Sequence, residues 1–506
     1  MLSSYAATNF GLVSLLKAHA CDPDWFVCRA FPAPYPLAAF AGNQGVLQKA
    51  RDWFEVALKL QPGSDALRLH LAETAFAQGD RQKAVQYLAE IKTIDPARSP
   101  LMQDQRYEAR IVNARQEAAQ GDWQAAVRDF RLGLAWGDER TLPVDEQDYF
   151  RALAEVEKAN FTKNRADIDA IYRAGRYLAQ AGDWQAAVSY LERSEIMLRL
   201  PPRQAAWALT TLGRFNEAQG DVRSAIASYQ YAILMDPALR QPALRLLPLL
   251  KVFGADMTAD QIEQSLVHNG PTYRIGAQGE FYQYFVPITV LDGWTLIGYD
   301  LDEEMLEQAK SLEIYLWWQS DGKRPKGEGW TKVGDYWVQR QVVKNLFPNA
   351  GFEWGANENG IPLGHDHEFY NAPVGSLVVE TKNRAGLVTQ VAAANNSPSV
   401  HHVALVSRKI PVDLNSQYLM GGWIWDQGGS ATIGRSCNGQ GPDPISPYYL
   451  FGYQQQPLQT WVHYAYVSEP FPGFNSEACE ALLMNDANSE SPAFWDNVLW
   501  VRIQNP

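Results

Sequence analysis

The dipeptide Gly-Asp occurs five times in the first half of the chain, and four of the copies open the same pattern. Five residues after each of these four glycines stands an alanine, and a leucine, phenylalanine or tyrosine follows four residues later, one helical turn on. The four glycines are Gly79, Gly121, Gly182 and Gly220. A unit repeated in this way is typical of stacked helix pairs, in which each pair buries its apolar face against its neighbour. The first half is therefore predicted to be an α-solenoid.

The clearest unit spans residues 205–237. In it Gly213 and Ala225 are small enough for two antiparallel helices to approach closely, and larger apolar residues fill the groove between them. This pattern resembles the tetratricopeptide repeat, which is a pair of antiparallel helices ended by a proline. The resemblance covers roughly residues 40–240. Wider spacing between the later units predicts a longer loop and an extra helix within 136–162.

Residues 1–268 are assigned to this helical repeat domain. The resemblance implies a concave face that holds a peptide or a partner helix, so that other proteins, or further copies of the same chain, are the expected partners. Arg173, Arg176 and Arg214 lie on the first helices of repeats and are the candidate groove residues. The alternative is that these arginines are solvated or pair with acidic neighbours.

After His268 the helical pattern gives way to strand-like alternation broken by Gly, Pro, Asn and Asp. Residues 269–344 are predicted to form a small β-sandwich or barrel, with strands near 294–301 and 312–319. The "GYDL…LEIYLWWQ" pattern of these strands resembles β modules that follow membrane glycosyltransferase regions in some bacterial envelope proteins.

Residues 345–506 form the third predicted domain. The domain opens on the run 345–353 and closes on the run 494–498, and these two ends resemble those of jelly-roll carbohydrate-binding modules. The resemblance implies a β-sandwich whose opening and closing strands lie side by side, binding a glycan or a neighbouring subunit. It also implies a structural Ca²⁺ held by Glu353 and Asp496, since Ca²⁺ prefers oxygen ligands. The alternative is that both acids cap turns.

A sugar site requires aromatic rings that are accessible to the ligand, and loops are the expected place for them. The candidate carbohydrate-binding residues are Trp354, Tyr370, Tyr448, Tyr449 and Tyr453. Trp423 and Trp461 are instead expected at core positions of the sandwich. Packing, rather than binding, is the alternative role for each candidate.

Four cysteines form two local pairs, Cys21 with Cys28 and Cys437 with Cys479. Three pairings are possible, and the sequence does not choose among them. Disulfides would indicate an oxidising compartment, whereas four free thiols would fit a cytosolic protein. The first 20 residues make a poor signal peptide, so no targeting segment is visible.

Charge and hydropathy narrow the classes of partner. The net charge of −13 disfavours nucleic acids and anionic membranes. The sequence has no apolar run approaching the ~20 residues that span a bilayer.

The sequence contains no Gly-x-Ser-x-Gly elbow, phosphate loop or dinucleotide fingerprint. The run from His365 to His367 could grip a metal on a strand, but its setting after Pro362 and Gly364 predicts a polar loop. We therefore expect a non-catalytic protein without a catalytic cofactor.

The preferred interpretation is a bacterial extracellular or cell-envelope protein. Its solenoid would serve protein interaction or self-assembly, including into a filament, because two dissimilar ends favour head-to-tail contact. One alternative is the soluble, extracytoplasmic part of an envelope glycosyltransferase or polysaccharide ligase. A second alternative is a cytosolic peptide-binding adaptor.

Overall fold

The chain forms two compact units in the computed structural model. The first extends to Gly121 and includes Arg128–Gly137, and the second comprises Asp122–Val127 and Asp138–Pro506. The structure describes residues 44–506 except for 79, 92–99, 136–142, 194–196, 198, 276–288, 292, 328, 357–360, 370–376, 385–386, 395–402, 408–409, 414–415, 427–430, 438–447, 452–459, 469–477, 486–491 and 505.

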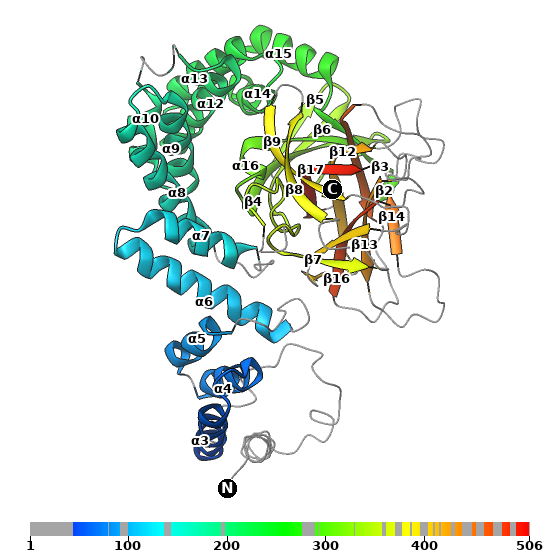
Figure 1. Cartoon of the computed structure of the whole chain (residues 1–506). Coiled ribbons are helices and arrows are strands. Elements are labelled where there is room, and N and C mark those ends of the chain that lie inside the picture. The colour runs from blue at the N-terminus through cyan, green and yellow to red at the C-terminus, as the bar shows by residue number, and fades with distance from the viewer. Residues whose placement is uncertain are drawn as a thin grey trace. The chain divides into compact units, whose positions relative to one another are not determined.

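Helices occupy the described residues up to position 269. The early helices are α3 (Gln44–Leu60), α4 (Asp65–Ala77), α5 (Arg81–Ala89), α6 (Pro100–Ala119) and α7 (Trp123–Leu134). The later ones are α8 (Pro143–Lys163), α9 (Ile168–Gln180), α10 (Trp184–Leu191), α12 (Pro202–Ala218), α13 (Val222–Met235), α14 (Gln241–Val252) and α15 (Asp256–Asn269). The extra helix expected within 136–162 is α8. In Figure 1, α8 to α15 follow one another as a curved stack.

The Gly-Asp dipeptide works as a helix stop followed by a helix start. The glycines at 121, 182 and 220 have φ values of 81°, 81° and 77°, a region that residues with a Cβ rarely adopt. At the next position the Asp221 carboxylate accepts a hydrogen bond from the backbone N–H of Ser224, 3.2 Å away, and so caps α13. The dipeptide therefore ends one helix and begins the next.

Close packing inside the repeats depends on small residues. A Cβ placed on Gly213 of α12 would overlap the ring of Tyr229 on α13. Ala225, on the same face of α13, is completely buried. The structure thus confirms that Gly213 and Ala225 let these two helices approach.

The first β region is one antiparallel sheet. Its strands are β1 (Tyr273–Arg274), β2 (Thr289–Leu291), β3 (Trp294–Leu301), β4 (Ser311–Ser320), β5 (Trp330–Val333) and β6 (Tyr336–Lys344), in the order β1-β3-β4-β6-β5 with β2 beside β3. The short helix α16 (Glu303–Leu306) joins β3 to β4. One face of this sheet packs through Tyr315, Trp317 and Val338 against the apolar sides of α13, α14 and α15.

The C-terminal region is a two-sheet β-sandwich. One sheet has the order β14-β13-β16-β10-β7 with β11 beside β16, and the other has the order β15-β12-β17-β9-β8. The strands are β7 (His365–Phe369), β8 (Leu377–Arg384), β9 (Leu387–Ala394), β10 (Val403–Ser407), β11 (Ile410–Pro411), β12 (Gln417–Asp426), β13 (Ala431–Cys437), β14 (Tyr448–Phe451), β15 (Val462–Ser468), β16 (Ala478–Asn485) and β17 (Ala493–Ile503). Completely buried Trp495 and Trp500 anchor its core.

The opening and closing runs of this sandwich meet, as predicted. Asn345 pairs with Val501 in an antiparallel bridge, and the Leu346 N–H donates to the Trp500 carbonyl at 2.7 Å. The buried Asn345 side chain bonds the backbone of both Val498 and Trp500. Among the described residues, no helix is long and apolar enough to cross a membrane.

Candidate functional site

The segment 300–313, which we call the docking segment, joins the helices of the second unit to the β regions. It comprises the end of β3, α16 and the start of β4. Glu146 of α8 accepts hydrogen bonds from the backbone N–H groups of Lys310 and Ser311 at 2.6 and 2.8 Å. The Tyr149 hydroxyl donates to the side chain of Gln308 at 3.0 Å. Helix α8 therefore binds the C-terminal half of the docking segment.

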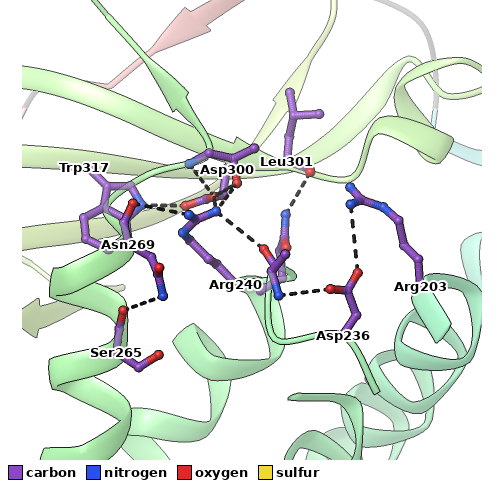
Figure 2. Close-up of polar contacts among 11 residues, drawn as sticks. Arg203, Asp236, Arg240, Ser265, Asn269, Asp300, Leu301 and Trp317 are labelled. Carbon is purple, nitrogen blue, oxygen red and sulfur yellow. Dashed lines mark hydrogen bonds and ion pairs between the residues drawn. The ribbon is translucent and has the colours of Figure 1, made fainter. Parts of the chain in front are cut away.

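At its other end the docking segment is fixed by a buried carboxylate, shown in Figure 2. Asp300 is fully buried, accepts a hydrogen bond from the Trp317 indole at 2.6 Å and lies 3.9 Å from Arg240. Burial raises the pKa of Asp300, opposed by Thr272 and Arg240. Next to it, Gln241 of α14 donates to the Leu301 carbonyl at 2.8 Å.

The three arginines predicted to line a peptide groove all contact acids of the same chain. Arg176 is buried, binds Asp302 and stacks 4.8 Å from the Trp207 ring. Arg173 forms two hydrogen bonds to Glu157, at 2.9 and 3.0 Å. Arg214 lies 3.9 Å from Glu313 and 5.8 Å from the ring of Trp184. These contacts fit the alternative stated from the sequence, in which the arginines pair with acidic neighbours.

In the ion pairs that hold the docking segment, burial and the partner's charge shift the pKa of a side chain in opposite directions. Although burial acts against the charge, Asp302 raises the pKa of Arg176 above its ordinary value. Burial also acts against the charge of Glu313, yet the nearby Arg245 guanidinium lowers the pKa of that carboxyl to about 2. Arg176 and Glu313 therefore stay charged at neutral pH, and each depends on its partner.

A cavity of about 360 Å³ lies between α9, α12 and the docking segment. Arg173, Arg176, Arg203, Gln204 and Trp207 line one side, with Tyr172 and Tyr177; Glu303, Glu304, Met305, Glu307, Gln308 and Glu353 line the other. Most of these residues could not be identified from the sequence as lining one cavity, because no local pattern indicates that residues near 304 pack against residues near 204.

Of the five candidate carbohydrate-binding aromatics, the structure describes the side chain of Trp354 alone. Trp354 is 6% exposed and packs edge-on against Tyr149, so it is a buried residue and not an accessible ring. Tyr448 and Tyr449 lie on β14, and their side chains are outside the described atoms. Tyr370 and Tyr453 lie outside the described residues.

A different aromatic row crosses the outer face of the sheet that contains β12. Trp425 lies opposite Phe494 on β17, with ring centroids 5.4 Å apart, and Trp461 lies 6.0 Å from Trp425 on the other side. The Lys382 ammonium is 4.3 Å from the Phe494 ring centroid and 5.7 Å from that of Trp425. Both tryptophans are half-buried. We call the rings of Trp461, Trp425 and Phe494, together with Lys382 beside them, the aromatic row.

Trp423 and Trp461 do not occupy the sandwich core, contrary to the expectation. The core takes Met420 and Ile424 from β12, so by strand alternation Trp423 and Trp425 face outward. Trp423 donates to Glu303 of α16 at 2.9 Å. The docking segment and β1 cover the Trp423 end of this outer face, and the aromatic row lies toward the other end.

The two predicted calcium ligands lie in the region where the opening and closing runs meet. Asp496 is fully buried and accepts from the backbone N–H of Asn497 at 2.8 Å, while Glu353 is half-buried and lines the cavity. The Asn497 side chain is 2% exposed, and both its amide atoms lack hydrogen-bond partners in the described part of the chain. Within the described residues, no three His, Cys, Asp or Glu side chains gather as metal ligands.

The His-Asp-His run lies on β7 and not in the polar loop that was predicted. His365 is buried against Phe347 and Phe352, with the ring centroid of Phe347 at 4.8 Å. Burial lowers the pKa of His365 to about 3. This histidine is therefore a neutral core residue at physiological pH.

The C-terminal cysteines are neighbours in the sheet. Cys437 on β13 is the direct register partner of Cys479 on β16, and Cys479 is buried. Directly opposed residues in antiparallel strands have Cα atoms about 4.5–5.5 Å apart, within the range that a disulfide spans. Cys21 and Cys28 lie outside the described residues.

The family model of the tetratricopeptide repeat matches residues 44–104. This match agrees with the helix pairs α3 to α5 and confirms the predicted repeats in that region. A search of curated proteins finds no match.

Several solved structures are similar to parts of the chain. The enzymatically active domain of a bacteriophage CBA120 tailspike is 14% identical with a TM-score of 0.22, over 29% of this chain and 21% of the tailspike chain. The CBM22-1 xylan-binding domain of Paenibacillus barcinonensis Xyn10C is 14% identical (TM-score 0.22; 31% of this chain, 94% of that one). MamA from Desulfovibrio magneticus RS-1 is 18% identical (TM-score 0.20; 40% and 94%). The fold described above rests on this chain's own helices and strand pairings.

Proposed function

We propose that this chain is a non-catalytic binding protein, in which the N-terminal repeats hold a protein partner and the C-terminal sandwich binds a glycan. The observation that carries the proposal is the use of the later helices by the chain itself. Arg176, Gln241 and Arg245 bind the docking segment, so α9 and α14 support the β regions. The repeats matched at residues 44–104 are the part we assign to a protein partner.

The aromatic row is the proposed glycan surface. Tryptophan rings on a sheet face can pack against the C–H faces of a sugar, and the Lys382 ammonium can donate to hydroxyl groups. Support comes from the half-buried rings of Trp461 and Trp425, which lie 6.0 Å apart, with the buried Phe494 ring packed against Trp425 on the adjacent strand β17. Of the loop aromatics suggested by the sequence, Trp354 is excluded by its burial, whereas Tyr370, Tyr448, Tyr449 and Tyr453 stay predictions.

Glycan-array binding by the full chain tests this proposal. Trp425→Ala should abolish binding while the protein remains folded by circular dichroism. Trp337→Ala is the matched control, because Trp337 is also a half-buried strand tryptophan with a lysine, Lys332, 5.8 Å from its ring. Glycan binding that survives Trp425→Ala, or no binding to any glycan by the wild type, would exclude the aromatic row.

We also propose a structural Ca²⁺ beside Asp496. Buried polar groups without partners are rare, and Asn497, whose two side-chain amide atoms are unpartnered, directly follows the buried Asp496 in the chain. Calcium should raise the thermal midpoint of the wild type, and Asn497→Ala should remove the increase. An equal increase in both proteins would place any bound ion elsewhere.

An extracellular or cell-envelope location is proposed from the opposed cysteines, because disulfides persist in oxidising compartments.

Self-association, including into filaments, is supported by apolar side chains on the second unit. Leu234 is 74% exposed on α13, and Val252 and Met257 at the α14–α15 turn are 83% and 81% exposed. Sedimentation velocity at rising concentration should show species larger than the monomer, and Val252→Ser with Met257→Ser should reduce them. A strictly monomeric wild type would exclude assembly.

A further inference from the structure

The cavity beside the docking segment has walls of opposite chemistry. Guanidinium groups of Arg173, Arg176 and Arg203 come from the helices, and carboxylates such as Glu304 come from the docking segment. Its volume of about 360 Å³ lies at the lower end of the ~300–1,000 Å³ typical of small-molecule sites. A ligand here must accept hydrogen bonds from one wall and donate them to the other.

On the helix wall, two polar groups are not fully used by the chain. The Oε1 atom of Gln204 is buried and accepts no hydrogen bond from the described residues. Arg203, one position earlier, is 51% exposed at its side chain, and its guanidinium lies 3.9 Å from Asp236, beyond hydrogen-bond distance (Figure 2). Arg173 and Arg176 are, by contrast, held by direct bonds to Glu157 and Asp302.

On the opposite wall, Glu304 is held in place while keeping capacity to accept. The Tyr172 hydroxyl donates to one of its carboxylate oxygens at 2.6 Å, and Arg176 is 3.8 Å from that same oxygen. Burial raises the pKa of Glu304, although Arg176 opposes the shift. An ionised carboxylate has about four lone-pair sites, so the tyrosine bond leaves room for further donors.

We propose that this cavity is a binding site for a small saccharide of one or two sugar units. A sugar hydroxyl both donates and accepts, so the same ligand satisfies the guanidinium wall and the carboxylate wall. Met305 and Trp207, which line the cavity, supply apolar surface for the C–H face of the ring. Gln204 lines the cavity, and a rotation of its side chain on binding would bring Oε1, which is buried and unpaired in the free protein, to a donating ligand hydroxyl.

This site is separate from the aromatic row, which lies on the sandwich. Its proposed role makes Gln204 a residue that serves binding at the expense of stability, since an unpaired buried acceptor is unfavourable in the unliganded protein. Removing that acceptor should therefore weaken binding without weakening the fold. A purely structural glutamine would not show this combination.

The test uses the full chain and isothermal titration with glucose, galactose, xylose, N-acetylglucosamine and their β-linked disaccharides. Gln204→Met keeps the side-chain length and removes the acceptor. We expect at least one sugar to bind, Gln204→Met to weaken it about tenfold or more, and the thermal midpoint of the free variant to be unchanged or higher. Arg203→Met should also weaken binding. Gln230→Met and Arg223→Met, on the exposed side of α13, are the matched controls and should bind as the wild type does.

The outcomes separate this proposal from the glycan surface on the sandwich. Loss of binding in Trp425→Ala but not in Gln204→Met would assign the sugar to the aromatic row and overturn the cavity proposal. No binding of any sugar, or binding only of free amino acids or short peptides in a parallel titration, would also overturn it. Sugar binding that persists in Trp425→Ala and weakens in Gln204→Met would support it.

Discussion

Replacing Arg176 with methionine tests whether the docking segment depends on a buried ion pair. The Arg176 side chain is 4% exposed and that of its partner Asp302 16% exposed, so the variant leaves a largely desolvated carboxylate without its counter-charge. Breaking one partner of a buried pair typically costs about 3–5 kcal/mol. Loss of the contacts to Tyr172 and Trp207 acts in the same direction.

The assay is differential scanning calorimetry of the full chain. At about 2 °C per kcal/mol for a large unit, the transition of the second unit should fall by roughly 6–10 °C. Arg151→Met is the control, because Arg151 pairs with Asp148 and Asp183 at a side-chain exposure of 42%. Such surface pairs are worth about 0–1 kcal/mol, so the control should shift the transition by ~2 °C or less.

A double variant distinguishes the ion pair from general packing. Asp302→Asn keeps a side chain that can accept from the Met305 N–H at the start of α16, but it removes the charge. Combined with Arg176→Met, it should recover at least half of the lost stability. The reasoning is refuted if the double variant is no more stable than Arg176→Met alone, or if Arg176→Met shifts the transition as little as the control does.

Two substitutions and one mapping experiment test the helix packing, the buried histidine and the cysteine pair. Gly213→Ala places a methyl group against Tyr229, and urea titration should show a loss of about 1–3 kcal/mol; an unchanged midpoint would contradict the close approach. Burial holds the pKa of His365 near 3, below its ordinary ~6.5, so the stability of the neutral form is complete above pH ~6.5 and is lost as pH falls toward 3. The thermal midpoint of His365→Phe should therefore fall less than that of the wild type over this range, and parallel profiles would be inconsistent with a buried neutral ring. Non-reducing peptide mapping of protein made in an oxidising compartment should find Cys437 joined to Cys479, and two free thiols there would remove the support for export.

Local signals in the sequence predicted the helical repeats well. A glycine at positive φ followed by an aspartate cap is a property of adjacent residues, so Gly220 and Asp221 reveal the turn without tertiary information. The meeting of the opening and closing strands was also predicted, because each end of the sandwich carries its own recognisable run; Asn345 and Val501, which pair there, are 156 positions apart.

The contacts of the candidate site could not be predicted in the same way. Trp354 stands in a polar, glycine-containing stretch that suggested exposure, but Tyr149 from a distant helix covers it. Similarly, the sequence around Arg176 suggested a groove arginine, because its partner Asp302 lies 126 positions later in the chain. Docking between elements depends on shape and on charge partners, and no period or motif in the chain encodes these.

The position of the docking segment has a consequence for synthesis on the ribosome. Gln308, which binds Tyr149, follows it by 159 positions, and Lys310, whose backbone binds Glu146, follows that residue by 164 positions. At about 5–20 residues per second, helix α8 is complete roughly 8–30 s before the segment that covers it is made. During that interval the faces of α8 and α9 that later hold the segment are exposed to the cell. We therefore expect nascent chains arrested before residue 300 to recruit chaperones more strongly than chains arrested after residue 345.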